Sequence, residues 1–195
     1  ISRAAIIVTN THWFIAGGGE FVGPSYRSSD RVDVFSATNL GEHRLFRLSA
    51  PRELIVAARL GDLLVFAGGP ALSVDIFDLI AFNWRPSQAL QQARNSPAAL
   101  LLNGWLALLG GNRGVDLFDG EQWQFIDSLV TSRERAAGAV GGGFAVLAGG
   151  LTSSGLSAEI DFCGFRGWIS QFRTSIMCPN ETIADEQVIC TVYAR

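Results

Sequence analysis

Short apolar runs and polar turns alternate along the whole chain. Residues 98–118 show the pattern: the apolar run AALLL, a turn at Asn103-Gly104, the second run WLALLGG, and then GVDLF, in which an acid stands between apolar residues. A further run, QWQFI, follows a turn at Asp119-Gly120. Runs this short, separated by turn residues, are typical of antiparallel β-strands. We therefore expect a small sheet of four strands from this part of the chain.

The same pattern recurs about every 42 residues. Each copy has a glycine pair that ends an apolar run and, further on, an aspartate between apolar residues. The glycine pairs are Gly17-Gly18, Gly68-Gly69, Gly110-Gly111 and Gly149-Gly150, and the aspartates are Asp33, Asp75, Asp116 and Asp161. Arginines at Arg52, Arg94 and Arg133 and tryptophans at Trp84, Trp123 and Trp168 keep the same register. Such small sheets cannot bury both faces alone, so we expect the copies to stack on one another.

This order of arginine, two apolar runs, glycine pair, variable loop, apolar-acid-apolar-aromatic segment and tryptophan resembles the kelch repeat, whose copies form the blades of a β-propeller. The resemblance covers essentially the whole chain. It divides the chain into repeats 1–51, 52–93, 94–132 and 133–177 and a partial fifth repeat, 178–195. The family usually has tyrosine where Phe35, Phe77, Phe118 and Cys163 stand, and the first copy has Phe46 as the nearest substitute for the tryptophan.

The resemblance implies an all-β, kelch-type β-propeller with four four-stranded blades plus a partial fifth, as one domain over residues 1–195. Kelch propellers commonly close with six or seven blades, and an unclosed ring leaves strand edges exposed. We therefore expect a segment of a larger propeller, completed by further chain or by another molecule.

The repeated residues have structural roles in this interpretation. Glycine pairs permit positive φ and a close approach of the backbone where the second strand ends. Tryptophans fill space between blades, and the arginines hydrogen-bond neighbouring turns. The four aspartates belong to four separate blades, so we do not expect them to form a catalytic group.

Composition narrows the function classes further. The chain has 195 residues, 48% of them hydrophobic and 17% charged, which is typical of a globular protein. No apolar stretch reaches the roughly 18 residues that a membrane-spanning helix needs. The net charge is -3, and the basic residues are scattered arginines without a basic run. We therefore expect neither a membrane span nor nucleic-acid binding.

Metal and catalytic chemistry have little support in the sequence. His12 and His43 have no neighbouring Cys, Asp or Glu at the spacing of zinc ligands. We predict no metal, no cofactor and no catalytic residues. The three cysteines, Cys163, Cys178 and Cys190, all lie in the last third, and Asn180-Glu181-Thr182 is a glycosylation acceptor pattern. These features favour a secreted or cell-surface location over the cytoplasm but leave the compartment, a disulfide and a glycan undecided.

Binding is expected in the loops between the glycine pairs and the aspartates, because their lengths differ between copies. The longest, GEFVGPSYRSSDR, offers Phe21, Tyr26, Arg27 and Arg31, a mixture of aromatic residues and arginines that is enriched at binding hot spots. A solvated loop without a partner is the alternative for this segment. The resemblance to kelch adaptors that bind acidic peptides implies a second set, Arg31, Arg113 and Arg135.

We predict a non-enzymatic protein-interaction or structural scaffold module that binds a protein partner through its propeller loops. Two alternatives stay open. One is a substrate adaptor that recruits acidic peptides. The other is an enzyme resembling the kelch-containing oxidases, which would need metal ligands from Tyr26, Tyr193, His12 and His43.

Overall fold

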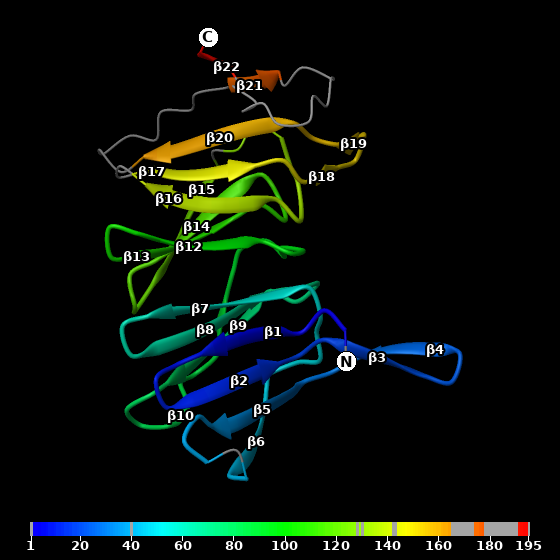
Figure 1. The fold of residues 1–195 in the computed structure, drawn as a ribbon, viewed down its shortest axis with the longest axis vertical. Coiled ribbons are helices and arrows are strands. Elements are labelled where there is room, and N and C mark those ends of the chain that lie inside the picture. Colours follow the sequence, from blue (N-terminus) through cyan, green and yellow to red (C-terminus); the bar gives the residue numbers. More distant parts are fainter. Residues whose placement is uncertain are drawn as a thin grey trace, which may run out of the picture.

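The computed structural model describes residues 2–39, 41–127, 129, 131–141, 144–164, 174–177 and 191–194. These residues form β-strands joined by turns, and the expectation of an all-β chain is confirmed. Four antiparallel sheets follow one another in sequence order, each built mainly from one predicted repeat, and Figure 1 shows them stacked along the long axis of the molecule. Within the described ranges there is no helix with the length and apolar character that crossing a membrane requires.

The strand order within the sheets is simple. The first sheet has the order β1-β2-β5-β6 (Ala5–Val8, His12–Ala16, Arg31–Ser36, His43–Arg47). The second has the order β10-β9-β8-β7 (Asn83–Trp84, Ser73–Asp78, Leu63–Gly68, Ile55–Leu60), and β11 (Gln88–Ala89) also pairs with β9. The third has the order β12-β13-β14-β15 (Ala98–Leu102, Trp105–Leu109, Gly114–Phe118, Trp123–Asp127). Neighbouring strands in these strand orders are antiparallel and follow one another along the chain, except that β3 and β4 come between β2 and β5.

The fourth sheet has the order β16-β17-β20-β21-β22 (Ala137–Gly141, Phe144–Ala148, Glu159–Gly164, Thr174–Met177, Thr191–Ala194). Two small hairpins lie outside the four sheets: β3-β4 (Gly19–Val22, Ser25–Ser28) and β18-β19 (Leu151–Thr152, Gly155–Leu156). Of the predicted fifth repeat, the structure describes only β22, which pairs with β21. Cys178, Asn180 and Cys190 lie outside the described residues, so the partial fifth blade, the disulfide and the glycan stay predictions.

Turn chemistry explains the hairpins. Leu102 pairs with Trp105 across the two-residue turn Asn103-Gly104. Both turn residues have positive φ, 50° at Asn103 and 85° at Gly104. A two-residue hairpin turn with positive φ at both positions matches the right-handed twist of the strands and favours Asn-Gly. The sequence signal and the backbone geometry agree at this position.

The core formed by the described residues consists of three apolar clusters, each between two successive sheets. The first strands of neighbouring sheets contact one another: β1 with β7, β7 with β12, and β12 with β16. The cluster between the first and second sheets includes Phe14, Val32, Phe66 and Phe77. The other two are centred on Val65, Ile76, Leu106 and Phe118 and on Ala107, Leu117, Ala145 and Leu147. The predicted stacking of the repeats is therefore where most apolar side chains are buried.

The glycine pairs join one sheet to the next. All eight of these glycines have positive φ, a region that L side chains rarely adopt. The amide of Gly18 donates to the carbonyl of Arg52 (2.9 Å), and the amide of Gly111 donates to that of Arg133 (2.7 Å). A Cβ at Gly111 would lie 2.8 Å from a backbone nitrogen of the third repeat. Glycine is required there by both conformation and space.

Trp84 and Trp123 are partly buried and pack against the apolar clusters between sheets. Trp84 is 5.1 Å from Phe77 between ring centroids, and Trp123 stacks on Phe118 at 4.8 Å. In the first sheet, Phe46 lies 5.2 Å from the same Phe77 ring. Trp168 is outside the described residues.

Candidate interaction sites

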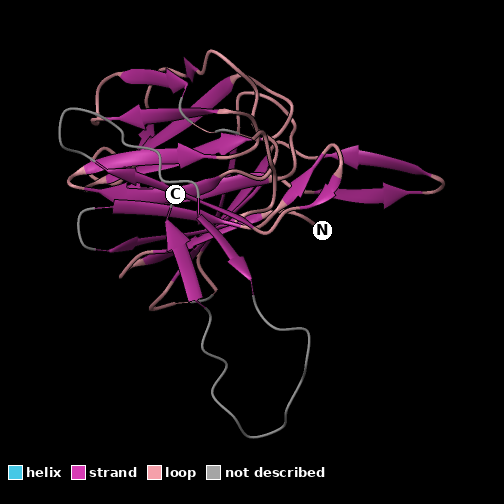
Figure 2. Ribbon diagram, turned by 90° about the horizontal axis from the view of Figure 1, so that it is seen from above, coloured by secondary structure: helices cyan, strands magenta, loops and turns pink. Residues whose placement is uncertain are grey.

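The long segment predicted as a variable loop is a β-hairpin that projects from the sheets. β3 and β4 pair from Gly19 with Ser28 to Val22 with Ser25. The turn between them contains Gly23, whose φ is +63°. The hairpin extends to the right in Figures 1 and 2, beyond the edge of the four sheets. This arrangement presents residues 20–27 to solvent on a regular backbone.

Tyr26 anchors this hairpin to the start of the second repeat. Its hydroxyl donates to the Glu53 carboxylate and lies 3.3 Å from the Ser2 hydroxyl. The Arg3 guanidinium bonds the same Glu53 carboxylate at 3.2 Å and stands 5.7 Å from the Tyr26 ring centroid. A Cβ at Gly19 would lie 2.5 Å from the Tyr26 hydroxyl, so the ring needs a glycine opposite it. Tyr26 was predicted as a contact residue; in the structure its side chain holds the hairpin against the start of the second repeat.

Phe21, Val22 and Arg27 are the outward residues of the hairpin. Phe21 is 76% exposed, although its ring meets Tyr26 edge to face at 5.1 Å. Val22 and Arg27 are exposed too, and among the described residues no carboxylate pairs with the Arg27 guanidinium. Large apolar side chains on a projecting, anchored hairpin are typical of contact surfaces.

Arg31, predicted in both binding sets, lies in β5 rather than in the hairpin. Its guanidinium donates two hydrogen bonds of 2.6 Å to Asp33, which also bonds His43 Nε2 at 2.6 Å. The His43 ring stacks on Phe35 at 4.7 Å. The hydrogen bond from Arg31, together with His43, holds the pKa of Asp33 below its ordinary value despite partial burial. The Arg31 guanidinium therefore pairs with a carboxylate of its own sheet.

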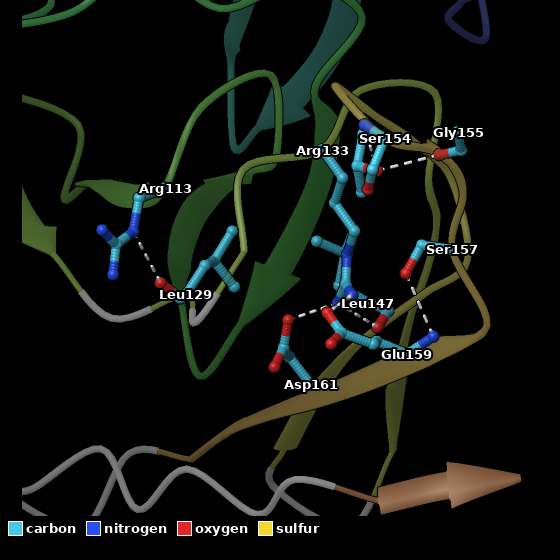
Figure 3. Close-up of polar contacts among 10 residues, drawn as sticks. Arg113, Leu129, Arg133, Leu147, Ser154, Gly155, Ser157, Glu159 and Asp161 are labelled. Atoms are coloured by element: carbon cyan, nitrogen blue, oxygen red, sulfur yellow. Dashed lines mark hydrogen bonds and ion pairs between the residues drawn. The ribbon is translucent and has the colours of Figure 1, made fainter.

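Arg113 and Arg135 occupy different surroundings. Arg113 Nε donates to the Leu129 carbonyl at 3.5 Å, as Figure 3 shows. Arg135 is exposed and lines a cavity of about 330 Å³ together with Arg3, Leu54 and Ser96. Within the described ranges, the lining of this cavity includes neither Arg31 nor Arg113. The structure does not gather the three predicted arginines in one place.

The cavity wall is built from equivalent positions of four repeats. Arg3, Leu54, Ser96 and Arg135 all have positive φ, between 47° and 59°. Their backbones form a chain of hydrogen bonds: Leu54 N to Arg3 O (3.3 Å), Ser96 N to Leu54 O (2.9 Å) and Arg135 N to Ser96 O (3.2 Å). Two arginines thus stand at the ends of a hydrogen-bonded series. Arg3 was not predicted as a binding residue. Its position in the repeat, two residues after the position of the register arginine and equivalent to that of Arg135, was the available signal.

The register arginines are buried and pair with the repeated aspartates. Arg52, Arg94 and Arg133 are at most 1% exposed. Arg94 Nε bonds Asp116 at 2.5 Å, and Nη1 bonds the carbonyls of Gly110 (2.9 Å) and Gly114 (2.7 Å). Arg52 likewise pairs with Asp75, and Arg133 pairs with Asp161 and Glu159, as drawn in Figure 3. These side chains stabilise the repeats and are not accessible to a ligand.

Burial lowers the pKa of two of these arginines, Arg52 and Arg94. It lowers the pKa of Arg52 to about 10, because a charged guanidinium loses its hydration inside the protein. Arg52 stays protonated at neutral pH. The turn contacts of the register arginines were predicted, whereas their aspartate partners were not. The recurrence of one arginine and one aspartate in each of these three repeats was the available signal.

The two histidines lie in different contacts. His12 is 4.8 Å from the Phe82 ring, whereas His43 bonds Asp33. Across the described part of the chain, no group of three or more His, Cys, Asp or Glu side chains is placed to hold a metal ion. Tyr26 bonds Glu53, and Tyr193 lies in β22. Tyr26, His12 and His43 therefore contact three different residues.

Comparisons with known proteins address the fold. No known protein family and no curated protein matches the chain. Among solved structures, the chain is similar to the structure of YjhT, with a TM-score of 0.65 and 12% identity over 96% of this chain and 67% of the YjhT chain. At this identity the likeness shows a shared fold. Part of the YjhT chain therefore has no counterpart in residues 1–195.

Proposed function

We propose that residues 1–195 form four blades of a kelch-type β-propeller that acts as a non-enzymatic protein-interaction module. The succession of antiparallel sheets, with their first strands side by side, supports the propeller arrangement. The projecting β3-β4 hairpin supports the interaction function. In this proposal, a protein partner contacts both faces of the hairpin, with Phe21 on one face and Val22 and Arg27 on the other.

The observation that carries this proposal is that one hairpin has an exposed aromatic side chain and is also fixed to the rest of the protein. Phe21 is 76% exposed, yet its neighbour Tyr26 fixes the hairpin through Glu53, Ser2 and Arg3. Pre-organised aromatic residues bind with a small loss of conformational entropy. Arg27 adds a cation that favours an acidic group on the partner.

The test compares immobilised wild-type chain with Phe21→Ala, using extract of the source organism and quantitative mass spectrometry. We expect at least one captured protein to be lost with Phe21→Ala. For that protein, calorimetry should show binding weaker by about 1–3 kcal/mol, with an unchanged Tm. Leu156→Ala is the matched control, because Leu156 is 92% exposed in the other small hairpin.

A second variant removes the hairpin while keeping its base. Because Gly19 pairs with Ser28, residues 20–27 can be replaced by Asn-Gly, which closes a two-residue turn. This variant should fold and lose the same partner. Retention of every captured protein by both variants would refute the proposed site.

The acidic-peptide adaptor remains a second candidate, supported by the cavity that Arg3 and Arg135 line. An acidic partner there should bind less tightly as salt rises. Arg135→Ala should weaken its binding, whereas Arg113→Ala, which removes an exposed arginine outside the cavity, should not. Equal effects of the two substitutions would count against this cavity as the site.

A further inference from the structure

Each contact between neighbouring sheets repeats one arrangement. The later sheet of each pair contributes three side chains, which we call the receiving face. Two of them stand two and four positions before the glycine pair, and the third stands two positions after the aspartate. They are Leu64, Phe66 and Phe77 in the second sheet and Leu106, Leu108 and Phe118 in the third, all fully buried. The earlier sheet contributes the intervening positions, which we call the presenting face: Phe14, Ala16, Val32 and Val34; Val65, Ala67, Val74 and Ile76; Ala107, Leu109, Val115 and Leu117.

The first sheet has a receiving face that the described residues leave open. Its members are Trp13, Ile15 and Phe35. Trp13 is 46% exposed, whereas its equivalent Leu64 is 0% exposed. Ile6 pairs with Ile15 and Val8 pairs with Trp13, so both lie on this face, and both are exposed. An apolar surface of this kind marks an interaction site in a folded protein.

Polar residues border this open face. Asp33 pairs across the strands with Ile15 on one side and Leu45 on the other. Its partners are Arg31 and His43, which are partly exposed, whereas Asp75 pairs with the fully buried Arg52. An apolar centre with charged residues beside it is the usual composition of a protein interface.

The fourth sheet carries the matching presenting face. Val146, Ala148, Ile160 and Phe162 occupy the same register as the presenting residues of the other sheets. All four are only partly buried, whereas equivalents such as Val65 and Leu109 are buried. The chain thus carries both halves of an interface that it already forms three times internally.

We propose that the chain associates with a second copy of itself head to tail, the presenting face of one fourth sheet packing on the receiving face of the other copy's first sheet. The second copy fits because it supplies the apolar positions that cover every other receiving face. Such an interface is heterologous: it closes a ring when the rotation between copies permits and otherwise adds further copies. Burial of Trp13, Val8 and Ile6 drives the association. This proposal is independent of the hairpin as a partner site.

The test is sedimentation velocity over a range of concentrations on the wild-type chain and three variants. The wild type should associate. Trp13→Glu, on the receiving face, and Val146→Glu, on the presenting face, should each be monomeric at concentrations where the wild type associates. Leu156→Glu, which alters an exposed residue outside both faces, should associate like the wild type. Circular dichroism checks that each variant is folded.

Mixing the two monomeric variants gives the sharpest outcome. Trp13→Glu retains a native presenting face and Val146→Glu a native receiving face, so the mixture should form a one-to-one dimer through one intact interface. A monomeric wild type, association that survives Trp13→Glu, or a mixture that stays monomeric would each overturn the proposal.

A second measurement serves if Val146→Glu does not fold. The emission of Trp13, obtained as the difference between the wild type and Trp13→Phe, should shift to shorter wavelength as concentration rises, because the indole leaves water. Phenylalanine keeps the face apolar, so Trp13→Phe should still associate. An emission that is constant over the range in which the wild type associates would overturn the proposal.

Discussion

Replacing Arg94 with methionine tests whether the buried ion pairs hold the repeats together. Arg94 is fully buried, and it bonds Asp116 at 2.5 Å and two glycine carbonyls at 2.7 and 2.9 Å. Methionine replaces the aliphatic part of the arginine side chain but not the guanidinium, so the substitution removes the charge and the donors and leaves the space of that group unfilled. The Asp116 carboxylate, 1% exposed, is then left without its guanidinium partner.

The expected loss is large. Removing one partner of a buried ion pair costs about 3–5 kcal/mol, because the remaining charge stays buried and uncompensated. The two carbonyls lose hydrogen bonds worth about 1 kcal/mol each, which brings the total to about 5–7 kcal/mol. The free energy of unfolding is measured by urea denaturation followed by far-UV circular dichroism, with the m-value checked for a change in cooperativity.

Two further variants isolate the cause. Arg31→Met removes the partner of Asp33, the equivalent aspartate in the first sheet, where the guanidinium is half exposed, and should cost much less than Arg94→Met. The double variant Arg94→Met with Asp116→Leu should be more stable than Arg94→Met alone, because no buried charge remains. The reasoning fails if Arg94→Met costs no more than Arg31→Met, or if removing Asp116 recovers nothing.

Three other predictions follow from local geometry. An L-residue in the left-handed conformation costs roughly 1–2 kcal/mol, and Gly104→Ala should cost only this amount, because the added Cβ would lie in open space. Gly111→Ala should cost more, because its Cβ would meet backbone atoms. Thermal melts of the two variants compare these losses of stability. Trp123→Ala should cost about 3 kcal/mol in urea denaturation, and a loss below 1 kcal/mol would contradict its packing role. Asp33, whose pKa is lowered chiefly by the Arg31 hydrogen bond, stabilises the fold above its unfolded pKa of about 3.9 and loses this as pH falls below it. The stability difference between wild type and Asp33→Asn should therefore shrink in acid, and a constant difference would contradict the linkage.

Repetition in the sequence determined the sheets. Glycine pairs such as Gly110-Gly111 and turns such as Asn103-Gly104 depend on local backbone conformation, which short stretches of sequence encode directly. The shared register of the arginines and tryptophans also predicted that the tryptophans fill space between repeats and that the arginines hydrogen-bond neighbouring turns. The fold class could be predicted because the same strand pattern recurs in each repeat.

Only the tertiary structure decided what the nonrepeating residues do. The segment around Phe21 has no period, so nothing in the sequence distinguished a loop from an anchored hairpin, and Tyr26 finds Glu53 only after two repeats stack. The sequence does not distinguish the three predicted arginines from one another. In the structure, Arg31 pairs with Asp33, Arg113 donates to a backbone carbonyl and Arg135 lines a cavity. The exposure of Trp13 likewise depends on which sheet lies over it. Contacts between distant segments set exposure and charge, and they exist only once the sheets have packed.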